Sequence, residues 1–209
     1  MGEPLPDALP ADPLPLAARW LDEARGVMKS ATAMALATLD AEGRPGVRMV
    51  ICRGLHVVDG WLVFYTDRDS AKGRALEKTP RAAAVFHWDV LERQIRVEGP
   101  VTRAPEADSD RYWSTRPLDA RLAAVASEQS RPLASRAELL ARIEAARRAH
   151  GEHVPRPARW GGYRVWAERV ELWAGQPGRA HDRAVWTRAL QPSETGFSGG
   201  AWRATRLQP

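Results

Sequence analysis

The sequence lacks the residues and motifs of several common structural and functional features. Its 209 residues contain a single cysteine, Cys52, which excludes an internal disulfide and a cysteine-based zinc cluster. No apolar run approaches the roughly 18 residues that a membrane-spanning helix needs. No Gly-x-Gly-x-x-Gly motif follows a predicted strand, so a Rossmann dinucleotide site is not supported. Residues 1–15 lack the basic and apolar stretches of a secretory signal. We therefore expect a cytoplasmic protein without a metal site.

Lysine is also scarce. Lys29, Lys72 and Lys78 are the only three, so the formal net charge of +5 depends almost entirely on arginine. A planar guanidinium group can hold phosphate or carboxylate through two hydrogen bonds at once. A site for an anionic small molecule would account for this composition, and so would a simple compositional bias. Nucleic-acid binding is less favoured, because the chain has no zinc-finger spacing, basic helix or run of like charges.

The length suits one domain. Residues 1–12 are rich in proline and predict a flexible lead-in, followed by a single domain over residues 13–209. Apolar spacing and capping residues predict helices over residues 13–28, 70–78, 104–114, 119–128 and 135–150. Strands are expected over residues 33–39, 46–56, 61–66, 81–88, 93–103, 163–174, 184–189 and 201–207. Antiparallel strands with inserted helices favour a mainly β fold with flanking helices, as a barrel or strongly curved sheet.

The sequence Arg179-Ala-His181-Asp-Arg183 carries the best local signal for chemistry. In an extended chain, residues two apart point to the same side, so the two arginines would flank a titratable imidazole. This arrangement suits a phosphate or carboxylate ligand. A solvated strand edge would have the same spacing.

A second group of residues could bind a phosphate. Arg48 and the pair Tyr65–Thr66 are expected on neighbouring strands of a hairpin, near Arg53. Ser70 and Lys72 lie at the start of a short predicted helix, where free backbone N–H groups favour an anion. A capped surface helix is the alternative.

A third candidate site is Tyr112-Trp-Ser-Thr-Arg116-Pro117. Tyr112 and Arg116 are four residues apart, so on a helix they would share a face and could bind one anion. An exposed arginine stacked on tyrosine is the alternative.

Several stretches together resemble the pyridoxamine 5′-phosphate oxidase family, in the family's order from about residue 9 to the end. They are Leu9-Pro-Ala-Asp-Pro-Leu14, Arg48-Met-Val-Ile-Cys-Arg53, Val63-Phe-Tyr-Thr66, Leu91-Glu-Arg-Gln94, Tyr112 to Pro117, Glu128-Gln-Ser130, Trp160-Gly-Gly-Tyr-Arg164, Glu171-Leu-Trp173, Arg179 to Arg183 and Arg206-Leu-Gln-Pro209. One such motif is weak evidence, whereas the ordered set is specific.

The resemblance implies an FMN-binding split β-barrel that forms a homodimer with FMN at the subunit interface. It implies FMN contacts at Arg48, Met49, Val50, Ile51, Cys52, Arg53, Tyr65, Thr66, Lys72, Gln94, Gln129, Ser130, Trp173 and Arg183. Of these, it places Gln129, Ser130, Trp173 and Arg183 on the opposite subunit from Arg48 and Lys72. The implied substrate contacts are Arg53, Tyr112, Arg116, Arg179 and His181, the last two also being the implied catalytic residues.

The implied reaction oxidises pyridoxamine or pyridoxine 5′-phosphate to pyridoxal 5′-phosphate with dioxygen and releases hydrogen peroxide. Four departures from the family pattern bear on the substrate. The family usually has Lys at Arg53, Arg at Ala71 and Ser at Ala120, and an N-terminal Arg-Arg-Glu-Tyr segment that is absent here. Two alternatives therefore stay open: a related flavin oxidase acting on another ring, as in phenazine pathways, and a non-catalytic protein that binds flavin or pyridoxal phosphate.

Overall fold

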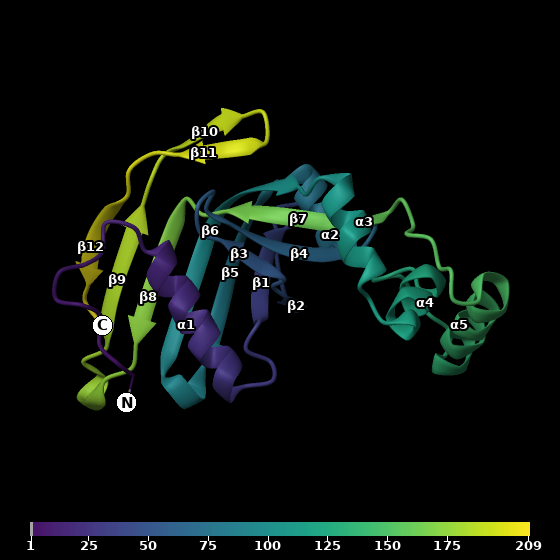
Figure 1. The fold of residues 1–209 in the computed structure, drawn as a ribbon, viewed down its shortest axis with the longest axis horizontal. Coiled ribbons are helices and arrows are strands. Elements are labelled where there is room, and N and C mark those ends of the chain that lie inside the picture. Colours follow the sequence, from purple (N-terminus) through teal and green to yellow (C-terminus); the bar gives the residue numbers. More distant parts are fainter. Residues whose placement is uncertain (1) are drawn as a thin grey trace.

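Figure 1 shows the fold in a computed structural model, which describes residues 2–209. The helices are α1 (Leu14–Val27), α2 (Ala71–Lys78), α3 (Glu106–Ser114), α4 (Leu118–Ala126) and α5 (Arg136–His150), with short 3₁₀ turns η1 (Asp89–Leu91) and η2 (Pro177–Arg179). The strands are β1 (Ala33–Leu39), β2 (Pro45–Ile51), β3 (Gly54–His56), β4 (Trp61–Asp67), β5 (Arg81–Trp88), β6 (Arg93–Arg103), β7 (Trp160–Trp166), β8 (Arg169–Ala174), β9 (Asp182–Thr187), β10 (Leu190–Ser193), β11 (Gly196–Gly199) and β12 (Arg203–Leu207).

Ten of these strands form one curled antiparallel sheet. Strands β12, β9, β8, β6, β5, β1 and β2 lie side by side in that order. The long strand β6 joins two parts of the sheet, because residues 93–98 pair with β8 while residues 101–103 pair with β7, which continues to β4 and β3. At the division, a Cβ on Gly99 would lie 1.9 Å from the carbonyl oxygen of Trp166, so only glycine allows this approach. The expected mainly β fold with flanking helices is confirmed.

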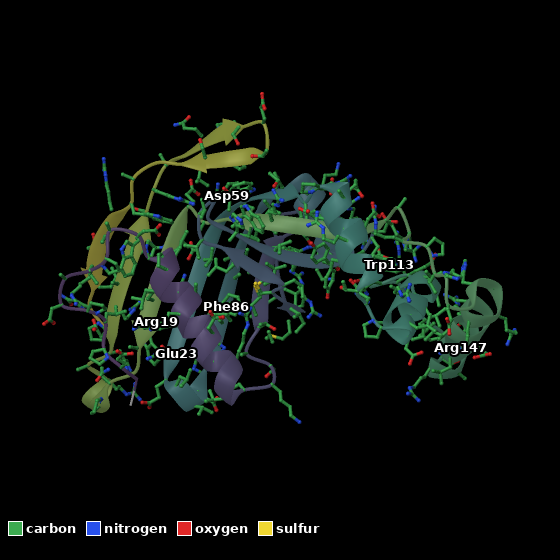
Figure 2. All side chains as sticks on the ribbon, viewed as in Figure 1. Arg19, Glu23, Asp59, Phe86, Trp113 and Arg147 are labelled. Atoms are coloured by element: carbon green, nitrogen blue, oxygen red, sulfur yellow. The ribbon has the colours of Figure 1, made fainter. Side chains whose placement is uncertain are left out.

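The main core lies between α1 and the sheet. Apolar side chains at helical spacing put one face of α1 against the strands, as Figure 1 shows: Leu14, Ala17, Trp20, Leu21 and Ala24. Met34 and Leu36 alternate with more exposed neighbours on β1, and Phe86, labelled in Figure 2, belongs to the same core. We call this covered side of the sheet the inner face and the other side the open face.

Three features of the strands differ from the expectation. The strand predicted over residues 46–56 is split into β2 and β3, because the backbone N–H of Cys52 still bonds to Thr32 while that of Arg53 bonds to Val63. The chain thus changes partner from β1 to β4. Likewise, residues 163–174 hold two strands, and the small hairpin of β10 and β11 was not predicted.

The expected flexible lead-in has no helix or strand, but it packs against the edge of the sheet. Leu5 is 3% exposed, and its N–H donates to Asp182 Oδ2 at 2.8 Å. Gly2 donates to the carbonyl of Gly175, and the Trp186 indole donates to the carbonyl of Pro10. These contacts attach the segment to the sheet, and its expected flexibility stays a prediction.

A second small core joins α3, α4 and α5 to the barrel. It contains Trp113, Leu122, Ala146, Val154 and Trp160. Trp113 is labelled in Figure 2 where the barrel meets these helices, and Arg147 marks α5 at the far end. The helices α4 and α5 project away from the sheet in Figure 1.

Candidate functional site

Lys72 is the centre of a buried polar cluster at the start of α2. Its ammonium group donates to Thr66 Oγ1 at 3.0 Å, to Ser70 Oγ at 3.3 Å and to Gln129 Oε1. Ser70 caps α2 by accepting from Gly73 N, as expected. Burial, followed by the nearby charge of Arg48, lowers the pKa of Lys72 to about 8, and Asp67 opposes this shift. Lys72 is thus a desolvated cation beside a second cation.

Arg48 supplies that second cation from β2. Its guanidinium donates to the Leu36 carbonyl at 3.1 Å and to Thr38 Oγ1 at 2.7 Å. Burial lowers its pKa. Within residues 2–209, no carboxylate forms an ion pair with Arg48 or Lys72, although most other arginines have one. Two neighbouring cations without an ion-pair partner favour binding of an anion here. The expected pairing between the strands of Arg48 and of Tyr65–Thr66 is wrong, since β2 pairs with β1, and the hairpin partner of β4 is β3.

A stack of aromatic rings lies beside a second cationic position. The Tyr65 ring lies 4.3 Å from that of Tyr112 and 5.6 Å from that of Trp160. The guanidinium of Arg116 lies over Trp160, 4.8 Å from the ring centroid, and Arg53 lies 5.3 Å from the centroid of Tyr112. Tyr112 and Arg116 were expected to share a helix face, which is wrong because Arg116 follows the end of α3. The side chains of both residues still contact this aromatic stack.

Arg116 faces a cleft of about 450 Å³. The cleft is lined by Tyr65, Thr66, Asp67, Arg116, Ala120, Ala123, Ala124, Ser127, Gln129, Leu139 and Trp160. One guanidinium N–H of Arg116 donates to the Ala120 carbonyl at 2.9 Å, while its Nε is buried without a partner. Burial lowers the pKa of Arg116; Tyr112 opposes this and Arg53 adds to it. A desolvated cation with an unused donor is suited to a phosphate or carboxylate oxygen.

Arg159 holds the segment that carries Gln129 and Ser130, a role that motif reasoning missed. Its Nε donates to Asp67 Oδ2 at 2.9 Å, and one terminal nitrogen lies 3.1 Å from the carbonyls of residues 124, 125 and 127 at the end of α4. A cation at a helix C-terminus is favourable. Ser130 has a positive φ of 72° in the following turn. This role of Arg159 could be recognised only from its contacts with the carbonyl groups at the end of α4.

Gln94, Trp173 and Arg183 form a separate line on the open face of the sheet. They are neighbours across three strands, with Gln94 on β6 opposite Trp173 on β8, and Trp173 opposite Arg183 on β9. The His181 ring lies 4.7 Å from that of Trp173, and His181 Nδ1 accepts from the backbone N–H of Gln176 at 3.2 Å. The structure therefore brings four of the expected site residues together here.

Arg179 is not on an extended strand with its neighbours, which corrects the expectation for this motif. It ends the turn η2 with a positive φ of 62°, and it is exposed. Side chains alternate between the two faces only within a strand, and β9 begins after Arg179. Strand geometry therefore does not put Arg179 on the same side as Arg183. Arg179 is thus placed by a turn and not by strand geometry.

The two groups of expected site residues lie on opposite faces of the sheet. Arg48 is opposite Leu36 on the inner face, whereas Trp173 alternates with the inner-face Leu172 and lies on the open face. Five strand steps separate β9 from β2, which is roughly 24 Å along the sheet. Gln129 also contacts Lys72 of its own chain, and its expected placement on the opposite subunit from Lys72 stays a prediction.

The rest of the 48–53 stretch divides by strand alternation. Met49 and Ile51 point to the open face and are 63% and 38% exposed, whereas Val50 packs against the core. Cys52 is buried, its thiol donates to the Gly54 carbonyl, and burial raises its pKa to about 11. A reactive thiolate is therefore disfavoured at this position.

Across residues 2–209, no cluster of three or more His, Cys, Asp or Glu side chains could hold a metal ion. No helix in that same range is long and apolar enough to cross a membrane.

Comparison with known families covers most of the chain. A family model described as pyridoxamine 5′-phosphate oxidase matches residues 21–150, and one described as the pyridoxine 5′-phosphate oxidase C-terminal dimerisation region matches residues 160–209. A pyridoxine/pyridoxamine 5′-phosphate oxidase of Gluconobacter oxydans is 44% identical over 203 residues, 96% of each chain. One of Anaeromyxobacter dehalogenans is 45% identical over 211 residues, covering 99% of this chain and 100% of the relative.

Two solved structures share the fold. PhzG from Burkholderia lata, in complex with tetrahydrophenazine-1-carboxylic acid, has a TM-score of 0.86 at 31% identity and covers 97% of this chain and 95% of its own. A pyridoxamine 5′-phosphate oxidase-related, FMN-binding protein from Nostoc punctiforme has a TM-score of 0.73 at 18% identity, covering 93% and 96%.

Proposed function

Because this chain belongs to the pyridoxamine 5′-phosphate oxidase family, we propose that it is an FMN-dependent oxidase of pyridoxamine or pyridoxine 5′-phosphate. One observation carries the proposal: two cationic positions without an ion pair among residues 2–209 lie at one cleft, because Thr66 and Gln129, which accept from Lys72, line it together with Arg116. Arg48 and Lys72 form one, and Arg116 with Arg53 forms the other. A flavin mononucleotide and a phosphorylated vitamer each bring one phosphate, so two anion positions match two ligands.

The residues present fit FMN. Lys72 and Arg48 are the phosphate ligands of the proposal, with Ser70 and Thr66 as neighbouring hydroxyls and free N–H groups at the start of α2. When bound, FMN supplies the two-electron acceptor for the substrate carbon and the route of those electrons to dioxygen, which leaves as hydrogen peroxide. The protein supplies binding, orientation and charge.

The substrate phosphate is assigned to the Arg116 cleft. The buried, unused Nε of Arg116 provides a donor, and the Tyr112 ring borders the same aromatic stack. The neutral form of His181 carries its proton on Nε2, because Nδ1 accepts a hydrogen bond from the Gln176 backbone. His181 can therefore donate from Nε2 to the reacting side of the substrate, and Arg179 is assigned to hold the ring.

A homodimer with the site shared between subunits follows from the separation within one chain. Gln94, Trp173 and Arg183 lie on the open face, whereas Arg48, beside Lys72, lies on the inner face, so we expect them to reach a flavin bound at Lys72 from a second copy. The same face exposes Val47, Met49 and Ile51 on β2. An exposed apolar strip of this kind favours burial against a partner.

A second candidate is a related flavin oxidase that acts on a ring without a phosphate. Two observations favour it: Ala120 lines the cleft with no hydroxyl, and PhzG, which was solved with a phenazine-type ligand, is structurally similar. Arg116 does not separate the two candidates, since a carboxylate on such a ring, as in the ligand of PhzG, would also pair with the guanidinium.

Turnover assays decide between the candidates. The purified chain is examined for released FMN by chromatography, for mass by light scattering, and for peroxide with pyridoxine 5′-phosphate, pyridoxamine 5′-phosphate and unphosphorylated pyridoxine. We expect FMN, a dimer, and peroxide only with the phosphorylated vitamers. Flavin-dependent oxidation of another ring with no vitamer turnover would favour the second candidate. Bound FMN without any turnover would indicate a carrier protein.

A further inference from the structure

Glu171 is a carboxylate buried beneath arginines at the edge of the proposed flavin site. It is 2% exposed, although its position on β8 is on the open face. Its Oε1 accepts from Arg183 Nε at 3.1 Å and from a terminal nitrogen of Arg183 at 2.7 Å. Its Oε2 lies 3.2 Å from Arg96 and 3.7 Å from Arg169. The carboxylate thus has cationic partners at both oxygens.

We propose that Glu171 is a positioning residue that aims the Arg183 guanidinium at the flavin, an inference that rests on the proposed function. The Glu171 carboxylate binds the Nε side of Arg183, and the Gln208 carbonyl accepts from another nitrogen at 3.1 Å. These contacts use three of the five N–H groups of the guanidinium, so two stay available for a ligand in a fixed direction. Without the carboxylate, the long side chain of Arg183 would lose this constraint.

The sheet register explains why the carboxylate is at this place. Glu171 and Trp173 are two residues apart on β8, so both point to the open face, and Trp173 is directly opposite Arg183. The Arg183 side chain therefore leans diagonally along the sheet from the Trp173 position toward Glu171. The distance across such a diagonal is within reach of a long side chain.

Glu98 provides a matched control. It is a second carboxylate on the same face and pairs with Arg96 at 2.8 Å and with Arg169 at 3.7 Å. Unlike Glu171, it has no contact with Arg183 among the ion pairs of residues 2–209. Removing either carboxylate takes one negative charge from the same arginine cluster, but only Glu171→Gln releases Arg183. The two substitutions separate positioning from general electrostatics.

The test measures FMN dissociation constants by fluorescence on flavin-stripped full-length protein. We expect Glu171→Gln to raise the constant about tenfold or more, the loss of a charged hydrogen bond. Glu98→Gln is expected to change it by less than about threefold, as for an exposed ion pair. In an Arg183→Ala background, Glu171→Gln should add less than about twofold, because a positioning residue has nothing left to position.

Several results would overturn the inference: an unchanged constant for Glu171→Gln, an equal effect of Glu98→Gln, or a full additional loss in the Arg183→Ala background. Thermal unfolding of the stripped variants separates a fold defect from a binding defect. If Glu171→Gln does not fold, Glu171→Asp retains the charge but shortens the reach, and we expect it to raise the constant severalfold; no change would contradict positioning. Failure of the unaltered chain to bind FMN would instead refute the proposed function.

Discussion

FMN affinity should decrease as the pH rises from 7 to 9, because the binding site contains a lysine that titrates in this range. Burial, followed by the adjacent Arg48, lowers the pKa of Lys72 to about 8. The proposed ligand phosphate is a dianion throughout this range, since its second pKa is near 6. A bound dianion stabilises the ammonium form and raises the pKa of Lys72 again. Flavin binding is therefore coupled to proton uptake above pH 8.

The magnitude follows from the protonated fraction of Lys72 in the flavin-free protein. With a pKa of about 8, roughly nine-tenths of the molecules carry the charge at pH 7 and about one-tenth at pH 9. If only the charged form binds the phosphate well, the dissociation constant rises about tenfold over these two pH units. Neither Cys52, with a pKa of about 11, nor Tyr65, whose pKa is raised by burial, titrates in this window.

The assay is a fluorescence titration of flavin-stripped protein with FMN at fixed ionic strength and several pH values. Lys72→Arg is the matched control, because arginine keeps its charge to pH 9 and should show a flat profile even if its affinity is lower overall. A constant that varies by less than about twofold in the unaltered protein would refute the coupling. A slope in Lys72→Arg equal to that of the unaltered protein would assign the titration to another group.

Three further predictions concern the cleft, the α4 segment and the N-terminal residues. Ala120→Ser should lower KM for the phosphorylated vitamers severalfold with similar kcat, because it restores a hydroxyl beside Arg116. A hydrogen bond to a charged group contributes about 1.5–3 kcal/mol. An unchanged KM would place the phosphate elsewhere. Arg159→Met should weaken FMN binding and lower the melting temperature, because it frees the segment that holds Gln129 beside the ammonium group; tight binding with a normal melting temperature would contradict this. Leu5→Ala should lower the unfolding free energy by about 2–5 kcal/mol in chemical denaturation, the usual loss for a buried leucine. A loss below about 0.5 kcal/mol, typical of surface sites, would mean that the segment is not part of the folded core.

Much of the local structure was predictable because its causes are local. The apolar spacing of residues 14–24 determines which side of α1 is buried, and Ser70 caps α2 through an atom in its own turn. The same is true of the hairpin turn at Gly60, whose φ is 76°. The break between β2 and β3 was not predictable in this way. The chain is extended on both sides of it, and only the hydrogen-bond partners of Cys52 and Arg53 differ, which the apolar periodicity does not show.

The identities of the site residues also came from the sequence, while their grouping did not. The ordered motifs are sufficient to assign the family, and they include every member of the line Gln94, Trp173 and Arg183. The motifs could not show that this line and Lys72 lie on opposite faces of the sheet. That separation depends on strand order and on the parity of the register, which puts Gln94 opposite Trp173 although they are 79 positions apart.

By itself, the sequence determined the antiparallel β architecture, the family and the chemical types of the site residues, because alternation, turn residues and ordered motifs are read along the chain. Only the tertiary structure decided which cations among residues 2–209 have no ion pair with a carboxylate, as is true of Lys72 and Arg116, and which carboxylate, Glu171, is buried under several arginines. The physical reason is that desolvation and ion pairing depend on distances between segments remote in sequence. Those distances are set by how the sheet curls and in what order its strands pair.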